Sequence, residues 1–281
     1  MDIMKRCLKL LNEKTGVLSN FRGASQMATV SMLCLSTDPE WEVEQMLTAY
    51  GDLKEVFRGS EYLAMTAIAI ARFAEPSQYQ QTASKTREIY NRLSDVLPFL
   101  TSVEDSTFAV LLALSGLDDL YIEQEIERCY TILKPSFFSG KSLSHVLALG
   151  NEQAEGKCRK ALELFTILKS HGHKYGTDYE LATLGVLALI NIDTDVLVNE
   201  MIWVDAYLKK QKGFGAFGIG SQQRLMYADM LVTNDHIPEA QTMQTAALNG
   251  IISLAIAQQV AIYASVTAAS SAALSSSSFE S

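Results

Sequence analysis

Proline is scarce in this sequence, and β-type patterns are missing. The 281 residues include only five prolines, and no stretch alternates apolar and polar residues as a half-buried strand does. Apolar residues make up 48% of the chain and charged residues 20%, a balance typical of a globular protein with a buried core. The sequence therefore predicts an all-α fold.

Signals for export, cysteine pairing and nucleic-acid binding are also lacking. The first six residues lead into an amphipathic stretch without the apolar segment of a signal peptide. The formal net charge of −9 argues against a general nucleic-acid surface. Scattered cysteines without a CxxC pair indicate reduced, buried thiols in a cytoplasmic protein. These cysteines are Cys7, Cys34, Cys129 and Cys158.

A unit of about 40 residues repeats along the chain, and residues 177–220 are its clearest copy. This copy combines a short apolar helix, a polar turn, an amphipathic helix and a loop rich in glycine and aromatics. Two series of positions, one in each helix of the unit, recur at matching intervals. Two independent helices would rarely share such intervals by chance. The apolar series is Leu33, Phe73, Leu112, Leu147 and Leu187, and the aromatic series is Tyr50, Tyr90, Tyr130 and Phe165.

The repeats predict a single domain over residues 1–281, built of antiparallel helical hairpins. Because a hairpin can bury its apolar helix only against its neighbours, the repeats (1–239) should form an α/α toroid or a strongly curved α-solenoid. A lone amphipathic helix at 1–14 precedes the hairpins, and an apolar helix at 221–233 follows them. The hairpins themselves are expected at 24–55, 60–97, 104–134, 142–170 and 178–212.

The segment from Ala240 to Phe279 contains no charged residue. A membrane span is one interpretation, but Gln258 and Gln259 lie in its middle and would be costly in hydrocarbon. We instead expect a long helix over 240–274 that packs on the repeats or on a second copy of the chain, followed by a frayed tail at 275–281. No membrane contact and a homo-oligomer through this helix are the corresponding predictions.

Several segments resemble a bacterial family found in Firmicutes, the domain-of-unknown-function family number four thousand and three. They are TGVLSNFRG, SLSHVLALG, GTDYELATLGVLALI, QKGFGAFGIGSQQRLM and TAALNGIISLAIAQQ, and the resemblance covers essentially the whole chain. It implies an additional N-terminal segment in family members, so that residues 1–14 would be the second helix of a hairpin whose first helix is missing. It implies no activity.

The architecture also resembles the repeats of α/α-toroid enzymes such as terpenoid cyclases and protein prenyltransferases. Those repeats also combine an apolar helix, an amphipathic helix and a KGFG-type loop, and their hairpins close into a double ring around a central cavity. The DDxxD and DxDD motifs of the cyclases are absent, and the Cys/His/Asp zinc set of the prenyltransferases cannot be placed. The resemblance therefore implies the architecture and not that chemistry.

The loops that lead into the apolar helices carry aromatic and basic residues. Arg22, Arg58 and Arg224 lie at or just before helix starts, where the helix dipole disfavours a cation. Free N–H groups at helix starts together with arginines can bind an anion. The alternative is that the arginines pair with acids on neighbouring loops and that the aromatics pack between repeats. The candidate ligand-binding residues are Arg22, Glu61, Asp105, His145, Asp178, Glu180 and Arg224.

No motif for a catalytic site, a metal or a cofactor is recognisable. His145 lies on an apolar helix, where a core histidine is commoner than a catalytic base. His171 and His173 have no third metal ligand in view. The glycine-rich run at 213–220 follows a helix and lacks the GK[ST] ending of a phosphate loop. No cofactor is expected, and no catalytic residue is assigned.

Two function classes remain. The first is a non-enzymatic helical-repeat protein that binds a small anionic ligand, or a protein or peptide partner, on a concave or central surface. The alternative is an enzyme with its active site in the central cavity of an α/α toroid, acting on an anionic small molecule. We expect the first class because no catalytic motif is visible.

Overall fold

The structure is a computed structural model, and it describes residues 2–23, 25–96, 101–176, 180–214 and 219–236. These residues form helices and contain no strand, which confirms the all-α prediction. The helices fall into two compact units, the first ending at Gly116 and the second beginning at Leu117. The expected single domain over residues 1–281 stays a prediction.

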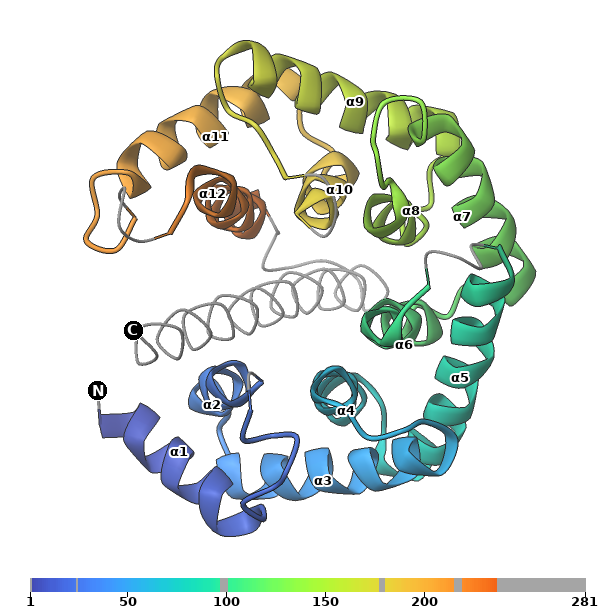
Figure 1. Ribbon diagram of the computed structural model, residues 1–281, viewed down its shortest axis with the longest axis vertical. Helices are drawn as coiled ribbons and strands as arrows, with labels where there is room; N and C mark the ends of the chain where they lie inside the picture. The colour runs from blue at the N-terminus through green and yellow to red at the C-terminus, as the bar shows by residue number, and fades with distance from the viewer. Residues whose placement is uncertain (1, 24, 97–100, 177–179, 215–218, 237–281) are drawn as a thin grey trace, which may run out of the picture. The chain divides into compact units, whose positions relative to one another are not determined.

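The first unit alternates short buried helices with longer amphipathic ones (Figure 1). Helices α2, α4 and α6, of which α4 and α6 are mostly buried, lie on one side, and α1, α3 and α5 lie on the other. Neighbours of the same kind contact each other, since α4 packs on α6 and α3 packs on α5. In chain order the elements are α1 (Asp2–Lys14), α2 (Gln26–Cys34), α3 (Pro39–Val56), α4 (Glu61–Phe73), η1 (Pro76–Gln78), α5 (Tyr79–Val96), η2 (Val103–Asp105) and α6 (Ser106–Leu114).

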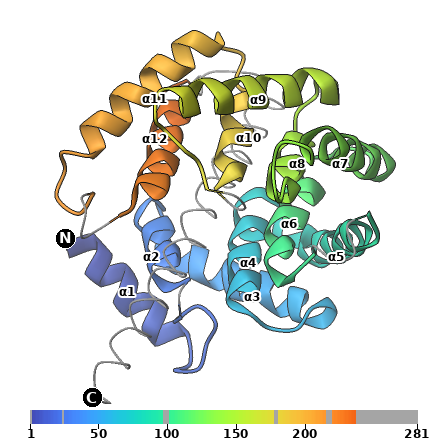
Figure 2. The same ribbon diagram turned by 45° about the horizontal axis from the view of Figure 1, so that its top comes forward.

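The second unit follows the same scheme (Figures 1 and 2). Helices α8 and α10 are almost entirely buried and α12 is buried on one face; α10 contacts both α8 and α12, and α9 lies between α7 and α11. Every residue of α8 is buried. The elements are α7 (Asp119–Leu133), α8 (Lys141–Leu147), α9 (Ala154–Ser170), α10 (Leu181–Leu189), α11 (Thr194–Leu208) and α12 (Ser221–His236). The helices therefore lie where the sequence predicts helices, with bounds that differ by a few residues.

The polar turns start the amphipathic helices by capping them. Asp38 accepts from the amide of Trp41 at the start of α3, and Asp118 and Asp193 cap α7 and α11 in the same manner. A short side-chain oxygen satisfies an amide that has no partner within its own helix. Capping therefore explains part of the acidic character of these turns.

The apolar series identified in the sequence is buried except at one position. Leu112, Leu147 and Leu187 are each 0% exposed, as predicted. Phe73, by contrast, is 38% exposed because it is the last residue of α4, where the helix ends in solvent. Ile70, one turn earlier, is fully buried. Phe73 therefore does not share the full burial of the other four positions.

Aromatic side chains in the loops pack on aromatic side chains of a following helix. Such edge-to-face pairs add about 0.5–1.5 kcal/mol beyond the area that they bury. The predicted packing of aromatics between repeats is thus confirmed at four places. The pairs, with their ring-centroid distances, are Phe21–Tyr50 at 5.2 Å, Phe57–Tyr90 at 5.5 Å, Phe137–Phe165 at 4.8 Å and Phe214–Tyr227 at 5.5 Å.

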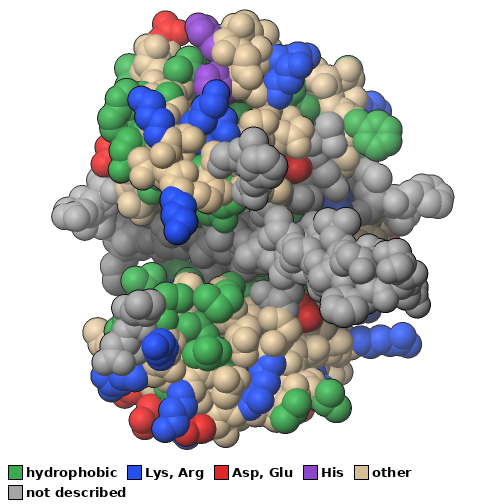
Figure 3. All heavy atoms as spheres, turned by 60° about the vertical axis from the view of Figure 1, so that its left-hand side comes forward, with side chains coloured by type: hydrophobic (Ala, Val, Ile, Leu, Met, Phe, Trp, Pro, Cys, Tyr) green, Lys and Arg blue, Asp and Glu red, His purple; other side chains and the backbone are tan. Residues whose placement is uncertain are grey.

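None of the described helices has both the length and the hydropathy that crossing a membrane requires. The predicted helix over 240–274 and the tail at 275–281 lie outside the described residues. On the face drawn in Figure 3, lysine and arginine side chains are interspersed with apolar and acidic ones. The described part of that face therefore forms no continuous basic surface.

Candidate functional site

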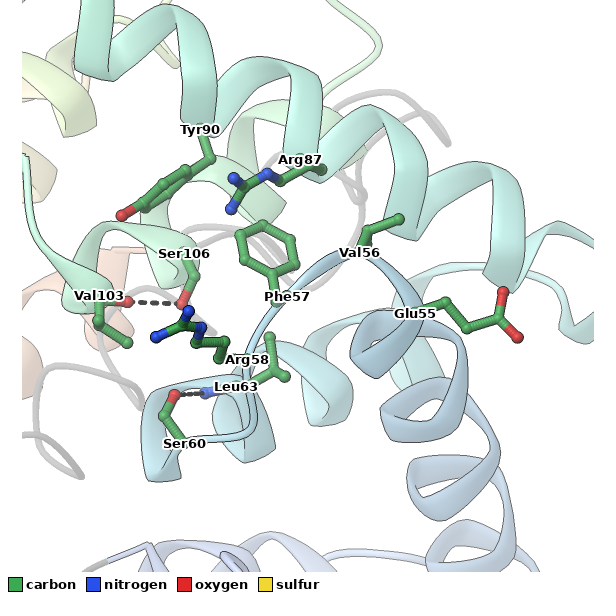
Figure 4. A pocket seen from close by; sticks show the side chains of 10 residues that line it. All are labelled: Glu55, Val56, Phe57, Arg58, Ser60, Leu63, Arg87, Tyr90, Val103 and Ser106. Atoms are coloured by element: carbon green, nitrogen blue, oxygen red, sulfur yellow. Dashed lines mark hydrogen bonds between the residues drawn. The ribbon is translucent and has the colours of Figure 1, made fainter.

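A pocket of about 460 Å³ opens in the first unit where the loop after α3 passes α5 and the start of α6 (Figure 4). Its volume is within the range of small-molecule sites. It contains two arginines, two aromatic rings and two serines. The lining residues are Glu55, Val56, Phe57, Arg58, Ser60, Leu63, Arg87, Tyr90, Val103 and Ser106.

The two arginines of the pocket come from different elements. Arg58 lies in the exposed loop between α3 and α4, and Arg87 projects from the middle of α5. No ion pair joins either guanidinium group to a carboxylate among the described residues. Glu55 is the only acid among the described lining residues, and Figure 4 shows it pointing away from both arginines. The pocket therefore has an excess of positive charge.

The aromatic rings hold Arg87 in place. Phe57 ends α3 in an extended conformation and meets Tyr90 edge to face at 82°. The Arg87 guanidinium carbon lies 4.9 Å from the centroid of Phe57 and 5.3 Å from that of Tyr90. Cation–π contacts of this kind fix a guanidinium group without neutralising it. Arg87 is thus positioned while its charge stays available to a ligand.

Two buried helices start at the rim of the pocket. Ser60 caps α4, and its hydroxyl accepts from the amide of Leu63 at 3.1 Å. Ser106 begins α6, and its hydroxyl donates to the carbonyl of Val103 at 2.8 Å. The N-terminus of a helix carries partial positive charge and amides without helical partners. The helix starts thus add to the attraction that the arginines exert on an anion.

The chemical groups of the pocket are suited to holding an anion. Among its described lining residues there is no histidine, cysteine or aspartate, and the carboxyl group of Glu55 points away from both arginines. A general acid or base needs a titratable group within hydrogen-bond reach of the reacting atom. Guanidinium groups, hydroxyls and aromatic rings can hold and orient an anion without a general acid or base. No metal site is apparent either, since the described residues include no cluster of three or more potential metal ligands.

In the first unit, the residues predicted from the sequence lie near the starts of the buried helices but do not line this pocket. Arg22 donates to the carbonyls of Asn12 and Thr15 and so caps the end of α1. Glu61 is the first residue of α4. Asp105 is fully buried and accepts from the amide of Ser102 at 2.6 Å. Asp105 therefore has a structural role at the start of α6.

In the second unit, the predicted residues are also engaged or buried. Arg224 forms a bidentate ion pair with Asp205, with N–O distances of 2.8 and 3.2 Å. His145 is buried in α8, and Glu180 is buried just before α10. Asp178 lies outside the described residues. The expectation that the candidates of both units share one cavity stays a prediction.

The sequence reasoning missed Arg87 and Tyr90 as partners in one pocket. Arg87 lies inside an amphipathic helix, where an arginine usually faces solvent. The available signal was its spacing of three residues from Tyr90, which places both on one side of α5. Arg58 and Phe57 were noted as part of a charged and aromatic loop, but the pocket that they form was not predicted.

A buried carboxyl group in the second unit was also missed. Asp229 of α12 is fully buried and accepts a hydrogen bond of 2.5 Å from the hydroxyl of Tyr175. Thr233 donates to its other oxygen at 3.3 Å. Burial raises the pKa of Asp229 to about 7, against the opposing effect of the hydrogen bonds from Tyr175, Thr183 and Thr233. An acid within the apolar run LMYADMLV was the signal for this group.

Comparisons with curated proteins and with solved structures found no match. A protein-family model, in contrast, matches residues 1–260. This match confirms the resemblance that the repeat segments suggested. It covers nearly the entire chain, and the protein therefore belongs to the family described as protein of unknown function, DUF4003.

Proposed function

We propose that this protein is a non-enzymatic binding protein that takes a small anionic molecule in the Arg58–Arg87 pocket. The observation that supports the proposal is the pair of arginines without acidic partners among the described residues, one of them held by aromatic rings. A pocket that binds only apolar molecules would not concentrate two such charges. A bound anion would neutralise the charges of both guanidinium groups.

The ligand class follows from guanidinium geometry. An arginine offers paired N–H donors that match the oxygens of a phosphate or a carboxylate. Helix starts favour the same anionic groups. The apolar side chains of Val56, Leu63 and Val103 leave room for a carbon skeleton beside the charged group. We therefore expect an organic phosphate or carboxylate rather than a bare inorganic ion as the physiological ligand.

The paired layers within each unit support the architectural part of the proposal. Buried helices on one side and amphipathic helices on the other are the arrangement that α/α toroids and curved α-solenoids use. We propose that the whole chain adopts such an array. A cytoplasmic location is part of the same proposal and is supported by the free state of all four cysteines.

An enzyme with its active site in the central cavity of a toroid remains the second candidate function. It is favoured by Asp229, whose raised pKa and contact with Tyr175 are the properties of a proton-transferring carboxyl group. Structural networks can have the same properties, and the Arg58–Arg87 pocket does not contain Asp229. Binding is therefore the function that we propose first.

Isothermal titration calorimetry with inorganic phosphate and with citrate tests the proposal. Each of Arg58→Ala and Arg87→Ala should weaken binding about tenfold or more, because a charge-assisted hydrogen bond contributes about 1.5–3 kcal/mol. The control is Arg159→Ala, which removes an exposed arginine of α9 in the second unit. Thermal melts should show that all three variants are folded.

Two results would contradict the proposal. One is that neither anion binds the wild-type protein at millimolar concentration. The other is that Arg159→Ala weakens binding as much as the pocket variants do, which would indicate general charge attraction. Loss of binding in Asp229→Asn with full binding in both arginine variants would support the second candidate function instead.

A further inference from the structure

One face of α1 forms a wall of a second groove in the first unit, with a volume of about 470 Å³. The opposite wall is the turn between α2 and α3 together with the first turn of α3. Among the described helices, α1 packs on α2 and α3, and Figures 1 and 2 show it at the end of the row that it forms with α3 and α5. The groove therefore lies at an end of this layer of helices.

The α1 wall of the groove has the spacing of a stripe on which two helices pair. Ile3, Cys7 and Leu10 line the groove at intervals of four and three residues. Such intervals align side chains along one side of a helix, where a second helix can cover them. Ile3 is 51% exposed, and Leu35, which precedes the wall residue Ser36, is 77% exposed. Exposed apolar side chains beside a groove are typical of a surface that another chain covers.

The charged residues of this wall have opposite signs toward the two ends of α1. Arg6 and Glu13 both line the groove and are about two helical turns apart, so they lie on the same side of the apolar stripe. Glu40, in the first turn of α3, adds an acid on the opposite wall. No ion pair joins Arg6 or Glu40 to another described residue. Glu13 is 3.6 Å from Lys9, but both side chains are largely exposed, and their contact is weak.

We propose that this groove is the interface of a homodimer in which α1 of one copy lies antiparallel to α1 of a second copy. In a two-fold interface the same surface serves both copies, so that it has to be complementary to itself. The antiparallel arrangement sets Arg6 of each copy against Glu13 of the partner subunit and brings Leu10 close to the two-fold axis. The proposal is independent of the function proposed for the anion pocket and of the oligomer predicted through the C-terminal helix.

The charges favour a second copy over a partner of one sign. A strongly acidic partner would meet Glu13 and Glu40, and a strongly basic one would meet Arg6, and contacts between like charges disfavour a complex. A second copy satisfies both signs at once. The charges also favour the antiparallel direction, because parallel helices would place the two copies of Arg6 at one level and the two copies of Glu13 at another.

Sedimentation velocity of the full chain over a series of concentrations tests the proposal. We expect the wild-type chain to dimerise. Arg6→Glu and Glu13→Arg should each weaken dimerisation about tenfold or more, because each replaces two attractive contacts by two repulsive ones. Lys5→Glu is the matched control, since it reverses an exposed charge of α1 that does not line the groove, and it should dimerise as the wild type does. Circular dichroism should show that all variants are folded.

A mixture of the two single variants gives the most specific result. Arg6→Glu has acids at both positions, and Glu13→Arg has bases at both. The mixture should therefore form a heterodimer more tightly than either variant forms a homodimer. The double variant Arg6→Glu/Glu13→Arg should dimerise as the wild type does, because exchanging the two signs preserves the complementarity.

Three results would overturn the inference. A monomeric wild-type chain is the result expected if another part of this chain or a different protein covers the groove. A dimer that is equally strong in both single variants would place the interface elsewhere, for example at the predicted C-terminal helix. A mixture without a heterodimer would show that positions 6 and 13 do not face each other across the interface.

Discussion

Phe57 and Tyr90 meet edge to face, with their ring centroids 5.5 Å apart, and the Arg87 guanidinium group lies over both rings. Phe57 comes from the loop after α3, and Tyr90 comes from α5. The pair thus joins two consecutive hairpins and positions a charge at the same time. The stability of the fold and the binding of an anion should therefore both depend on this contact.

The first prediction concerns this contact. Tyr90→Ala should lower the free energy of unfolding, since it removes an edge-to-face pair in addition to the buried area of the ring. It should also weaken anion binding, because Arg87 loses one of its two rings. Tyr90→Phe is the matched control and should preserve both properties, as Phe165 does at the corresponding repeat position in its pair with Phe137. Calorimetric titration and urea unfolding of the two variants measure these effects. Equal binding by Tyr90→Ala and wild type would show that the rings do not position Arg87.

The second prediction concerns the buried helices. Leu187 in α10 is fully buried, and Leu187→Ala should reduce the free energy of unfolding by about 2–5 kcal/mol, through lost apolar contact and a residual cavity. Leu120→Ala is the control, because Leu120 is 57% exposed and its loss should have little effect. Urea unfolding followed by circular dichroism provides both values. Similar values for the two variants would contradict the assignment of α10 as a buried helix.

The third prediction concerns a buried ion pair in the second unit. Lys157 lies 2.7 Å from Glu125, with side chains only 1% and 5% exposed, and it also donates to the carbonyl of Gly150 at 2.8 Å. Lys157→Met should cost about 3–5 kcal/mol of stability, because it leaves the Glu125 charge buried without its partner. Adding Glu125→Leu should restore much of this loss.

The exposed Lys9–Glu13 pair provides the control for that experiment. Its side chains are 78% and 62% exposed, and Lys9→Ala should produce no measurable loss in urea unfolding. If the Lys157→Met/Glu125→Leu double variant were no more stable than Lys157→Met alone, an unpaired charge could not be the cause of the loss.

The fourth prediction concerns pH. Burial raises the pKa of Asp229 from its usual value of 3.8 to about 7. At a pH between these two values, the Asp229 carboxyl group is ionised in the unfolded chain and protonated in the folded chain. The contribution of Asp229 to stability is therefore fully present below about pH 4 and is lost as the pH rises to about 7 and beyond. The loss should be on the order of a few kcal/mol.

Asp229→Asn should remove this part of the pH dependence, since the amide does not titrate. Asp235→Asn, on the exposed side of the same helix, is the control and should leave it unchanged. Urea unfolding at pH values from 4 to 8 gives the comparison. A wild-type profile as flat as that of Asp229→Asn would show that the carboxyl group is not held protonated by the fold.

The amino-acid sequence by itself determined the helical repeats and their phase. Periodic apolar positions such as Leu112, Leu147 and Leu187 indicate which helices are buried, because a helix turn and a hairpin each have a fixed length in residues. Turn acids such as Asp118 and Asp193 indicate where the next helix starts, because capping is a local interaction. The exposure of Phe73 was not anticipated because periodicity does not indicate where a helix meets solvent.

Only the tertiary structure decided which side chains act together. Arg87 and Arg58 share a pocket, Lys157 contacts Glu125, and Asp229 contacts Tyr175, although each pair is separated by many residues. No local pattern encodes such pairings, since they depend on how one hairpin packs on the next. Burial, which raises the pKa of Asp229, likewise depends on packing. The helices could thus be predicted from local chemistry, whereas the candidate sites required the contacts between helices.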